Sequence, residues 1–170
     1  DCLVEYARKY IGTPYRRGSK GPNRFDCSGF TQYIFNHFSY SLNASSASQY
    51  LQGISVKDEE ICRGDLVFFK GRNSRRSNVG HVGLVTEVYP DGRFKFIHAS
   101  TSQGIREDWN FSPYYAQRYV GARRIYFVQI DKRLILDAIL ELENIDDNTP
   151  FTETEKSITP QEFSTFVRAE

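Results

Sequence analysis

The first forty residues carry apolar side chains at helical spacing. Over residues 2–11 these recur every three or four positions, and Gly12-Thr13-Pro14 ends the predicted helix. A second helix is predicted to begin near Asp26, because its carboxylate can accept a first-turn N–H. The apolar face of this helix comprises Cys27, Phe30, Thr31, Ile34, Phe35 and Phe38. Residues 15–25, between the two helices, are rich in glycine and charge and predict a loop.

The pattern changes after residue 65 from helical spacing to short β-branched and aromatic runs. These runs predict strands over 66–69, 82–88, 94–99 and 119–127. Pro90-Asp91-Gly92 separates two of them and predicts a hairpin turn. The Ser- and Ala-rich residues 39–49 are expected to end in a short helix or loop. Helices followed by a block of strands indicate an α+β fold with an antiparallel sheet.

Charge divides the 170 residues into two parts. Residues 1–127 carry a net charge of +7 and residues 128–170 a net charge of −6, although the whole chain has only +1. The pattern of the second part predicts an apolar helical face over 134–142, then a polar linker and a short last helix. We therefore expect a basic folded domain over 1–127, able to attract anionic partners, and an acidic helical extension over 128–170.

Composition excludes several classes of protein. The hydrophobic share of 39%, with 13 Phe and 11 Tyr, supplies a packed core and argues against a wholly disordered chain. No run approaches eighteen consecutive apolar residues, so no transmembrane segment is expected. Cys2, Cys27 and Cys62 are too few for a disulfide scaffold. The chain begins with Asp1 and shows no signal segment, so composition leaves the compartment open.

Cys27 is the candidate nucleophile. It lies in the first turn of the second predicted helix, where the positive end of the helix dipole favours a thiolate and lowers the thiol pKa. The thiolate is the reactive form of cysteine. The alternative is a small apolar residue on a buried helix face, which is equally common for a free cysteine.

Two of the three histidines are candidates for the base. His81 lies between glycines at the start of one predicted strand, and His98 ends the next strand. Pairing of these strands through the Pro-Asp-Gly turn would bring the two rings together. His81 could then take the thiol proton while His98 fixes the tautomer of His81. His37 lies on another face of the Cys27 helix and is expected to be structural.

Two other functions fit the sequence poorly. The cysteine and histidine spacings match no compact zinc-ligand pattern, and no H-E-x-x-H occurs, so no metal site is expected. The arginine-rich residues 71–78 lack the interleaved aromatics of a nucleic-acid site. They are expected to form a solvated loop, or the rim of a site for an anionic substrate.

Six motifs in the same order resemble those of the NlpC-type cell-wall cysteine peptidases, over about residues 3–127. They are Tyr10-Ile11-Gly12-Thr13-Pro14-Tyr15, Phe25-Asp26-Cys27-Ser28-Gly29-Phe30, Arg63-Gly64-Asp65-Leu66-Val67-Phe68-Phe69, Gly80-His81-Val82-Gly83, Phe96-Ile97-His98-Ala99-Ser100-Thr101 and Gly121-Ala122-Arg123-Arg124. The resemblance implies a compact papain-like α+β domain, in which N-terminal helices pack on a central antiparallel sheet. It also implies a cofactor-free endopeptidase that cleaves γ-D-glutamyl-diamino acid bonds in peptidoglycan stem peptides.

The resemblance assigns roles to individual residues. Cys27 is the implied nucleophile, His81 the base and His98 the orienting residue, and the Tyr15 hydroxyl helps to stabilise the oxyanion. In family members that require a free N-terminal L-alanine, residues matching Asp26, Ser28 and Ser46 hold the substrate amine. These three side chains are therefore the implied substrate-binding residues.

The chain also departs from the family pattern. Asn43-Ala44 replaces the usual Pro-Arg, and Arg16-Arg17-Gly18-Ser19 replaces the usual Arg-Tyr-Gly-Gly. These departures leave both intact peptidoglycan and released peptides as candidate substrates. The sequence does not specify an oligomeric state. The alternatives are an amidase or acyltransferase on the same scaffold, or a non-catalytic module that binds cell-wall peptides. The family favours the cell envelope over the cytoplasm as location.

Overall fold

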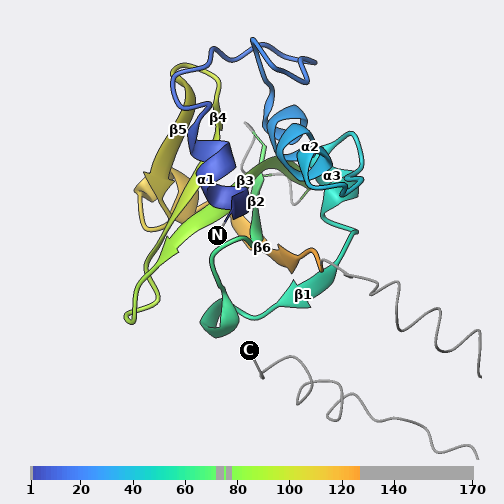
Figure 1. Cartoon of the computed structure of the whole chain (residues 1–170). Coiled ribbons are helices and arrows are strands. Elements are labelled where there is room, and N and C mark those ends of the chain that lie inside the picture. Colours follow the sequence, from blue (N-terminus) through green and yellow to red (C-terminus); the bar gives the residue numbers. More distant parts are fainter. Residues whose placement is uncertain (1, 72–74, 76–77, 127–170) are drawn as a thin grey trace, which may run out of the picture. The chain divides into compact units, whose positions relative to one another are not determined.

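The computed structural model describes residues 2–71, 75 and 78–126, which form an α+β domain (Figure 1). Its helices are α1 (Cys2–Arg8), α2 (Cys27–His37), α3 (Ser46–Gln49) and α4 (Pro113–Ala116), with a 3₁₀ turn η1 (Asp58–Glu60). Its strands are β1 (Ile54–Val56), β2 (Leu66–Lys70), β3 (Val79–Val88), β4 (Phe94–Ser100), β5 (Gly104–Trp109) and β6 (Tyr119–Arg124). The helical extension expected over 128–170, and its boundary, lie outside the described residues.

The six strands form one sheet in the order β1-β6-β2-β3-β4-β5, and all neighbours are antiparallel. The predicted α+β class with an antiparallel sheet is therefore confirmed. The Pro-Asp-Gly hairpin is confirmed as well. Gly92 has a φ of +82°, and the Tyr89 N–H donates to the Arg93 carbonyl at 2.8 Å. None of the helices in the described part of the chain is long and apolar enough to cross a membrane.

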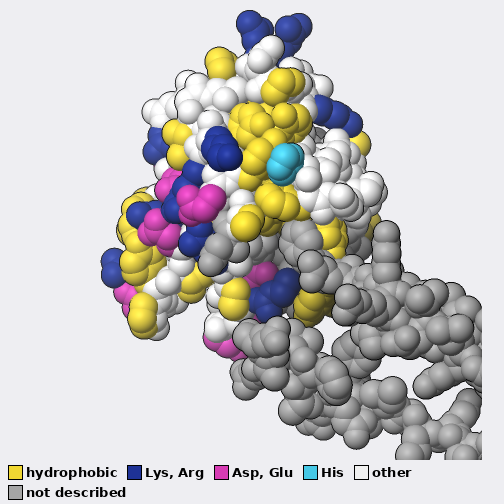
Figure 2. All heavy atoms as spheres, in the orientation of Figure 1, with side chains coloured by type: hydrophobic (Ala, Val, Ile, Leu, Met, Phe, Trp, Pro, Cys, Tyr) yellow, Lys and Arg dark blue, Asp and Glu magenta, His cyan; other side chains and the backbone are white. Residues whose placement is uncertain are grey.

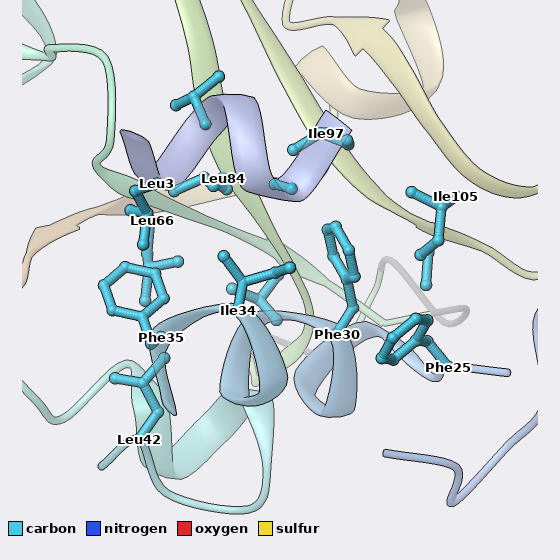
Figure 3. Close-up of a cluster of buried hydrophobic side chains, with 14 of the residues drawn as sticks. Leu3, Phe25, Phe30, Ile34, Phe35, Leu42, Leu66, Leu84, Ile97 and Ile105 are labelled. Atoms are coloured by element: carbon cyan, nitrogen blue, oxygen red, sulfur yellow. The ribbon is translucent and has the colours of Figure 1, made fainter. Parts of the chain in front are cut away.

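An inner hydrophobic cluster joins the helices to one face of the sheet. Phe30 and Ile34 of α2 are fully buried against Leu84 of β3 and Ile97 of β4 (Figure 3). Leu3 of α1 belongs to the same cluster. Because these apolar residues recur at helical spacing on α2, their burial is what holds the helix on the sheet.

The opposite face of the sheet carries a second, outer cluster. It comprises Val56, Ile61, Val67, Phe69, Val85, Phe94, Phe96 and Ala122, with Tyr115 and Tyr119 packed against it. Successive residues of a strand point to opposite faces, so Leu66 and Phe68 join the inner cluster while Val67 and Phe69 join the outer one. Burial on both faces explains the uninterrupted apolar run of β2.

The strands β1 and β5, the short helix α4 and the turn η1 were not predicted, and α1 ends earlier than expected. β1 has only three residues, and β5 reads Gly-Ile-Arg-Glu-Asp-Trp, which lacks an apolar–polar alternation. β5 is an edge strand, so its charged side chains can reach solvent or ionic partners. α1 ends at Arg8, before the predicted residue 11, because Gly12 turns the backbone and its N–H donates to Ile105 of β5.

A buried ion pair joins the two motifs Arg63-Gly64-Asp65 and Gly121-Ala122-Arg123-Arg124. The Asp65 side chain is 2% exposed, and its two carboxylate oxygens accept from Arg124 Nε at 2.8 Å and Nη2 at 2.9 Å. The Cys62 backbone N–H donates to the same carboxylate at 2.8 Å. The pair therefore ties the start of β2 to the end of β6.

We expect the Arg124→Gln substitution to lower the free energy of unfolding by about 3 kcal/mol, because it leaves the buried Asp65 carboxylate unpaired. Arg93→Gln is the matched control. Arg93 pairs with Asp91 at the surface, where both side chains are about half exposed, so its loss should leave the free energy of unfolding nearly unchanged. Urea unfolding followed by fluorescence measures both values, and equal losses would contradict the structural role given to the buried pair.

Candidate active site

The first turn of α2 presents Cys27, as the sequence predicts. Asp26 is the N-cap residue, and its Oδ1 accepts from the Gly29 backbone N–H at 2.7 Å. Its other oxygen accepts from the Gly18 N–H at 2.9 Å, which holds the preceding loop against the helix. The cap and the buried face of α2 thus fix the position of the thiol.

The β3–β4 hairpin brings His81 and His98 together. Leu84 pairs with Ile97, so the two histidines lie near the same end of adjacent strands. His81 Nε2 lies 3.0 Å from His98 Nδ1 and the ring planes are nearly perpendicular, at 84°. A Cβ on Gly83 would lie 3.3 Å from the His98 Cβ and 2.6 Å from the Phe96 ring. The absence of a side chain at Gly83 therefore lets Phe96 and His98 of β4 lie close to β3.

All four side chains predicted to take part in catalysis line one cavity of about 990 Å³. Cys27 reaches it from α2, His81 and His98 from the sheet, and Tyr15 from the loop that precedes α2. Further lining residues include Arg17, Lys70, Arg106, Asp108, Tyr114 and Tyr115. The structure thus brings together the four residues proposed for chemistry from segments far apart in the sequence.

The Cys27 thiol is largely buried, and this changes its acidity. Burial, together with the charge of the neighbouring Asp26, raises the pKa of Cys27 to about 11. Backbone N–H groups of Ser28, Val82 and Cys27 itself interact with the sulfur and act in the opposite direction, but they do not outweigh burial. The helix terminus thus acts in the predicted direction, but the predicted net lowering of the Cys27 pKa is wrong because burial outweighs it.

Both histidines of the site are neutral at physiological pH. Burial and the neighbouring His98 lower the pKa of His81 to about 3, although Asp108 acts against this. Burial also lowers the pKa of His98, although its hydrogen bond with Asp108 opposes the shift. Burial therefore favours a neutral thiol and neutral imidazoles over a thiolate–imidazolium pair in the substrate-free site.

Sequence reasoning missed a carboxylate at the end of this arrangement. Asp108 of β5 accepts from His98 Nε2 at 2.9 Å, and Arg106 Nη2 donates to its other oxygen. The Tyr115 hydroxyl of α4 lies 3.3 Å from the same His98 nitrogen. The edge strand that carries Asp108 was not predicted, so no pattern placed this residue beside His98.

Asp26, Ser28 and Ser46 are the three residues predicted to bind the substrate amine. The Ser28 hydroxyl donates to the Ala44 carbonyl at 3.0 Å and lies 3.4 Å from Asp26 Oδ1. Ser28 and Ser46 are buried, at 7% and 8% exposure. Among the described residues, none of these three lines the cavity that holds Cys27. Their assignment to a substrate amine stays a prediction.

His37 lies apart from the described site residues. Its ring stacks on Tyr6 of α1, with centroids 3.8 Å apart and planes 7° from parallel. This packing accords with the structural role expected for it. Among the residues that the structure describes, no group of three or more His, Cys, Asp and Glu side chains is arranged to hold a metal ion.

Comparison with known proteins finds relatives that are similar in sequence. The model of the NlpC/P60 family matches residues 12–124. A probable endopeptidase of Haemophilus influenzae is 36% identical over 124 residues, which cover 72% of this chain and 73% of the relative. The gamma-DL-glutamyl hydrolase of Bacillus subtilis is 33% identical over 132 residues, covering 76% of this chain and 30% of that protein. A probable endopeptidase p60 of Listeria grayi is 44% identical over 83 residues, 49% of this chain and 16% of the relative.

Solved structures agree with the sequence comparison. An NlpC/P60 family protein from Bacillus cereus superposes with a TM-score of 0.64 at 29% identity, covering 72% of this chain and 38% of that one. The chain spans less than half the length of that protein and of the Listeria and Bacillus subtilis relatives. Since the family model matches most of the described domain and the fold agrees, the chain belongs to the NlpC/P60 family.

Proposed function

We propose that this protein is a cysteine endopeptidase that hydrolyses γ-D-glutamyl-diamino acid bonds in peptidoglycan stem peptides. The observation that carries the proposal is the shared cavity lined by Cys27, His81 and Tyr15, with His98 hydrogen-bonded to His81 at 3.0 Å. Relatives named as a probable endopeptidase and a gamma-DL-glutamyl hydrolase support the reaction class. The solved NlpC/p60 domain of the peptidoglycan hydrolase SagA, which is 26% identical with a TM-score of 0.58, supports peptidoglycan as the substrate and the cell envelope as the site of action.

The neutral state of the site determines the order of the steps. His81 accepts the thiol proton as the Cys27 sulfur attacks the γ-carbonyl, so charge develops only when substrate is present. Backbone N–H groups of Cys27 and Ser28 already face the sulfur and are suited to the oxyanion, together with the Tyr15 hydroxyl. His81 then protonates the leaving amine, and water hydrolyses the thioester.

The charge of the cavity lining fits an anionic peptide. Arg17, Lys70 and Arg106 line the cavity, whereas Asp108 is the acidic residue among its described lining residues and pairs with Arg106. Figure 2 shows further Lys and Arg side chains at the tip of the α1–α2 loop. A γ-linked glutamyl residue keeps a free α-carboxylate, so Arg17 and Lys70 are the groups proposed to attract it.

Incubation with L-Ala-γ-D-Glu-diaminopimelate should release L-Ala-γ-D-Glu, which mass spectrometry identifies. Cys27→Ala should abolish release, and so should prior alkylation with iodoacetamide carried to completion at raised pH, because both remove the nucleophile; a chelator should not. Loss of activity to chelator but not to alkylation would overturn the mechanism. Release of an intact stem peptide from muropeptides would instead indicate an amidase, and acyl transfer to an added amine an acyltransferase. An N-acetylated peptide tests the predicted need for a free L-Ala amine.

Alkylation of Cys27 should be slow at neutral pH and should accelerate as pH rises towards 11. The reason is that iodoacetamide reacts with thiolate, and the raised pKa keeps the buried thiol protonated. The Cys2→Ser/Cys62→Ser background removes the two exposed cysteines, so that intact mass reports Cys27 alone. A rate that reaches its plateau below pH 8 would show a preformed thiolate and contradict the neutral resting site.

Arg17→Gln should raise KM for the tripeptide about 5-fold with little change in kcat, because one attractive charge at the cavity rim contributes about 1 kcal/mol. The difference should shrink in high salt, which screens exposed charges. Arg24→Gln is the matched control, since Arg24 is exposed on the same loop and is not among the described residues that line the cavity. Equal KM values for both variants would remove Arg17 from the substrate site.

A further inference from the structure

The two ring nitrogens of His98 have different partners. Nδ1 lies 3.0 Å from His81 Nε2, and Nε2 lies 2.9 Å from Asp108 Oδ2. The His98 side chain is fully buried and that of Asp108 is 16% exposed. A neutral imidazole carries one proton, so one nitrogen donates and the other accepts. The protonation state of Asp108 therefore decides which nitrogen of His98 donates a hydrogen bond and which accepts one.

Asp108 is a carboxylate in this environment. Burial acts against its ionisation, but the hydrogen bond with His98 and the charge of Arg106 outweigh burial and hold the pKa of Asp108 below its ordinary value. The groups that meet it are His98 of β4, Arg106 of its own strand and Tyr115 of α4. A carboxylate only accepts hydrogen bonds, so Nε2 of His98 must carry the proton.

This constraint passes from His98 to His81. Since Nε2 of His98 is protonated, Nδ1 is the acceptor and must receive the proton of His81 Nε2. A neutral His81 then has no proton on Nδ1. We propose that Asp108 is a positioning residue, which fixes both imidazoles in the Nε2–H form and leaves Nδ1 of His81 free to take the Cys27 proton. The catalytic consequence rests on the role proposed above for His81, but the tautomer assignment does not.

Arg106 makes Asp108→Asn a sharp test. Arg106 Nη2 donates to Oδ1 of Asp108, while Oδ2 meets His98. In the Asn variant, Arg106 will hold the amide oxygen on its own side, so the NH₂ group faces His98 Nε2. His98 must then carry its proton on Nδ1, which donates to His81 Nε2 and moves the His81 proton to Nδ1. Nδ1 of His81 then already carries a proton and cannot accept the one from Cys27, although the shape of the protein is nearly unchanged.

Asp108→Ala should be milder than Asp108→Asn. It removes the carboxylate without supplying a donor, and the Tyr115 hydroxyl already lies 3.3 Å from His98 Nε2. That hydroxyl oxygen can accept the Nε2–H, so the productive tautomer stays accessible. A purely structural role for Asp108 predicts the opposite order, because Asn preserves the packing and Ala leaves a gap.

Steady-state kinetics on the tripeptide should show a loss in kcat of at least about 100-fold for Asp108→Asn, with little change in KM and a smaller loss for Asp108→Ala. The order Asn below Ala supports the proposal. An Asn variant as active as, or more active than, the Ala variant overturns it.

Long-range ¹H–¹⁵N NMR of the histidine rings tests the same idea without substrate. We expect Nε2–H tautomers for His81 and His98 in the unmodified protein, and Nδ1–H tautomers in Asp108→Asn. An Nδ1–H His98 in the unmodified protein overturns the inference, whether or not the variants fold. Expected tautomers in a protein that does not cleave the tripeptide would refute the proposed function and leave the role of Asp108 intact.

Discussion

The packing of α2 against β3 and β4 is the contact on which the geometry of the site depends. Phe30 and Ile34 are buried against the strands that carry His81 and His98. Because the same helix begins at Cys27, its apolar face and its reactive first turn are placed by one set of contacts. The Asp26 cap then fixes the first turn itself, through the Gly29 N–H. The proposed nucleophile and the proposed base, which come from distant segments, thus line the same cavity.

Burial is also what makes the resting site neutral. The contacts that position Cys27 and His81 remove water from both, and this raises the pKa of the thiol and lowers that of the imidazole. The helix dipole is a local effect that the position of Cys27 in the sequence predicts. Desolvation depends on how tightly α2 meets β3, and no local pattern reports it. The direction of the Cys27 pKa therefore could not be predicted from the sequence.

Other parts of the site could be predicted from the sequence, because they depend on short local patterns. Asp26 before an apolar helical face predicts a cap, and Pro90-Asp91-Gly92 between two β-branched runs predicts the hairpin that aligns His81 with His98. Tyr15 was placed by its resemblance to a family motif, and the cavity lining includes it. β5 gave no such signal. Its charged residues are typical of a loop, and only its pairing with β4 shows that it is a strand.

The charges of β5 are consistent with a strand once its two faces are separated. Ile105 and Glu107 point towards the helices, where Ile105 is buried and Glu107 accepts from Arg8 Nε at 2.8 Å. Arg106 and Asp108 point the other way, towards His98. An edge strand can satisfy charges on both faces, because one side of its backbone needs no partner strand. The same alternation therefore gives β5 a structural face against α1 and a face that meets the histidines.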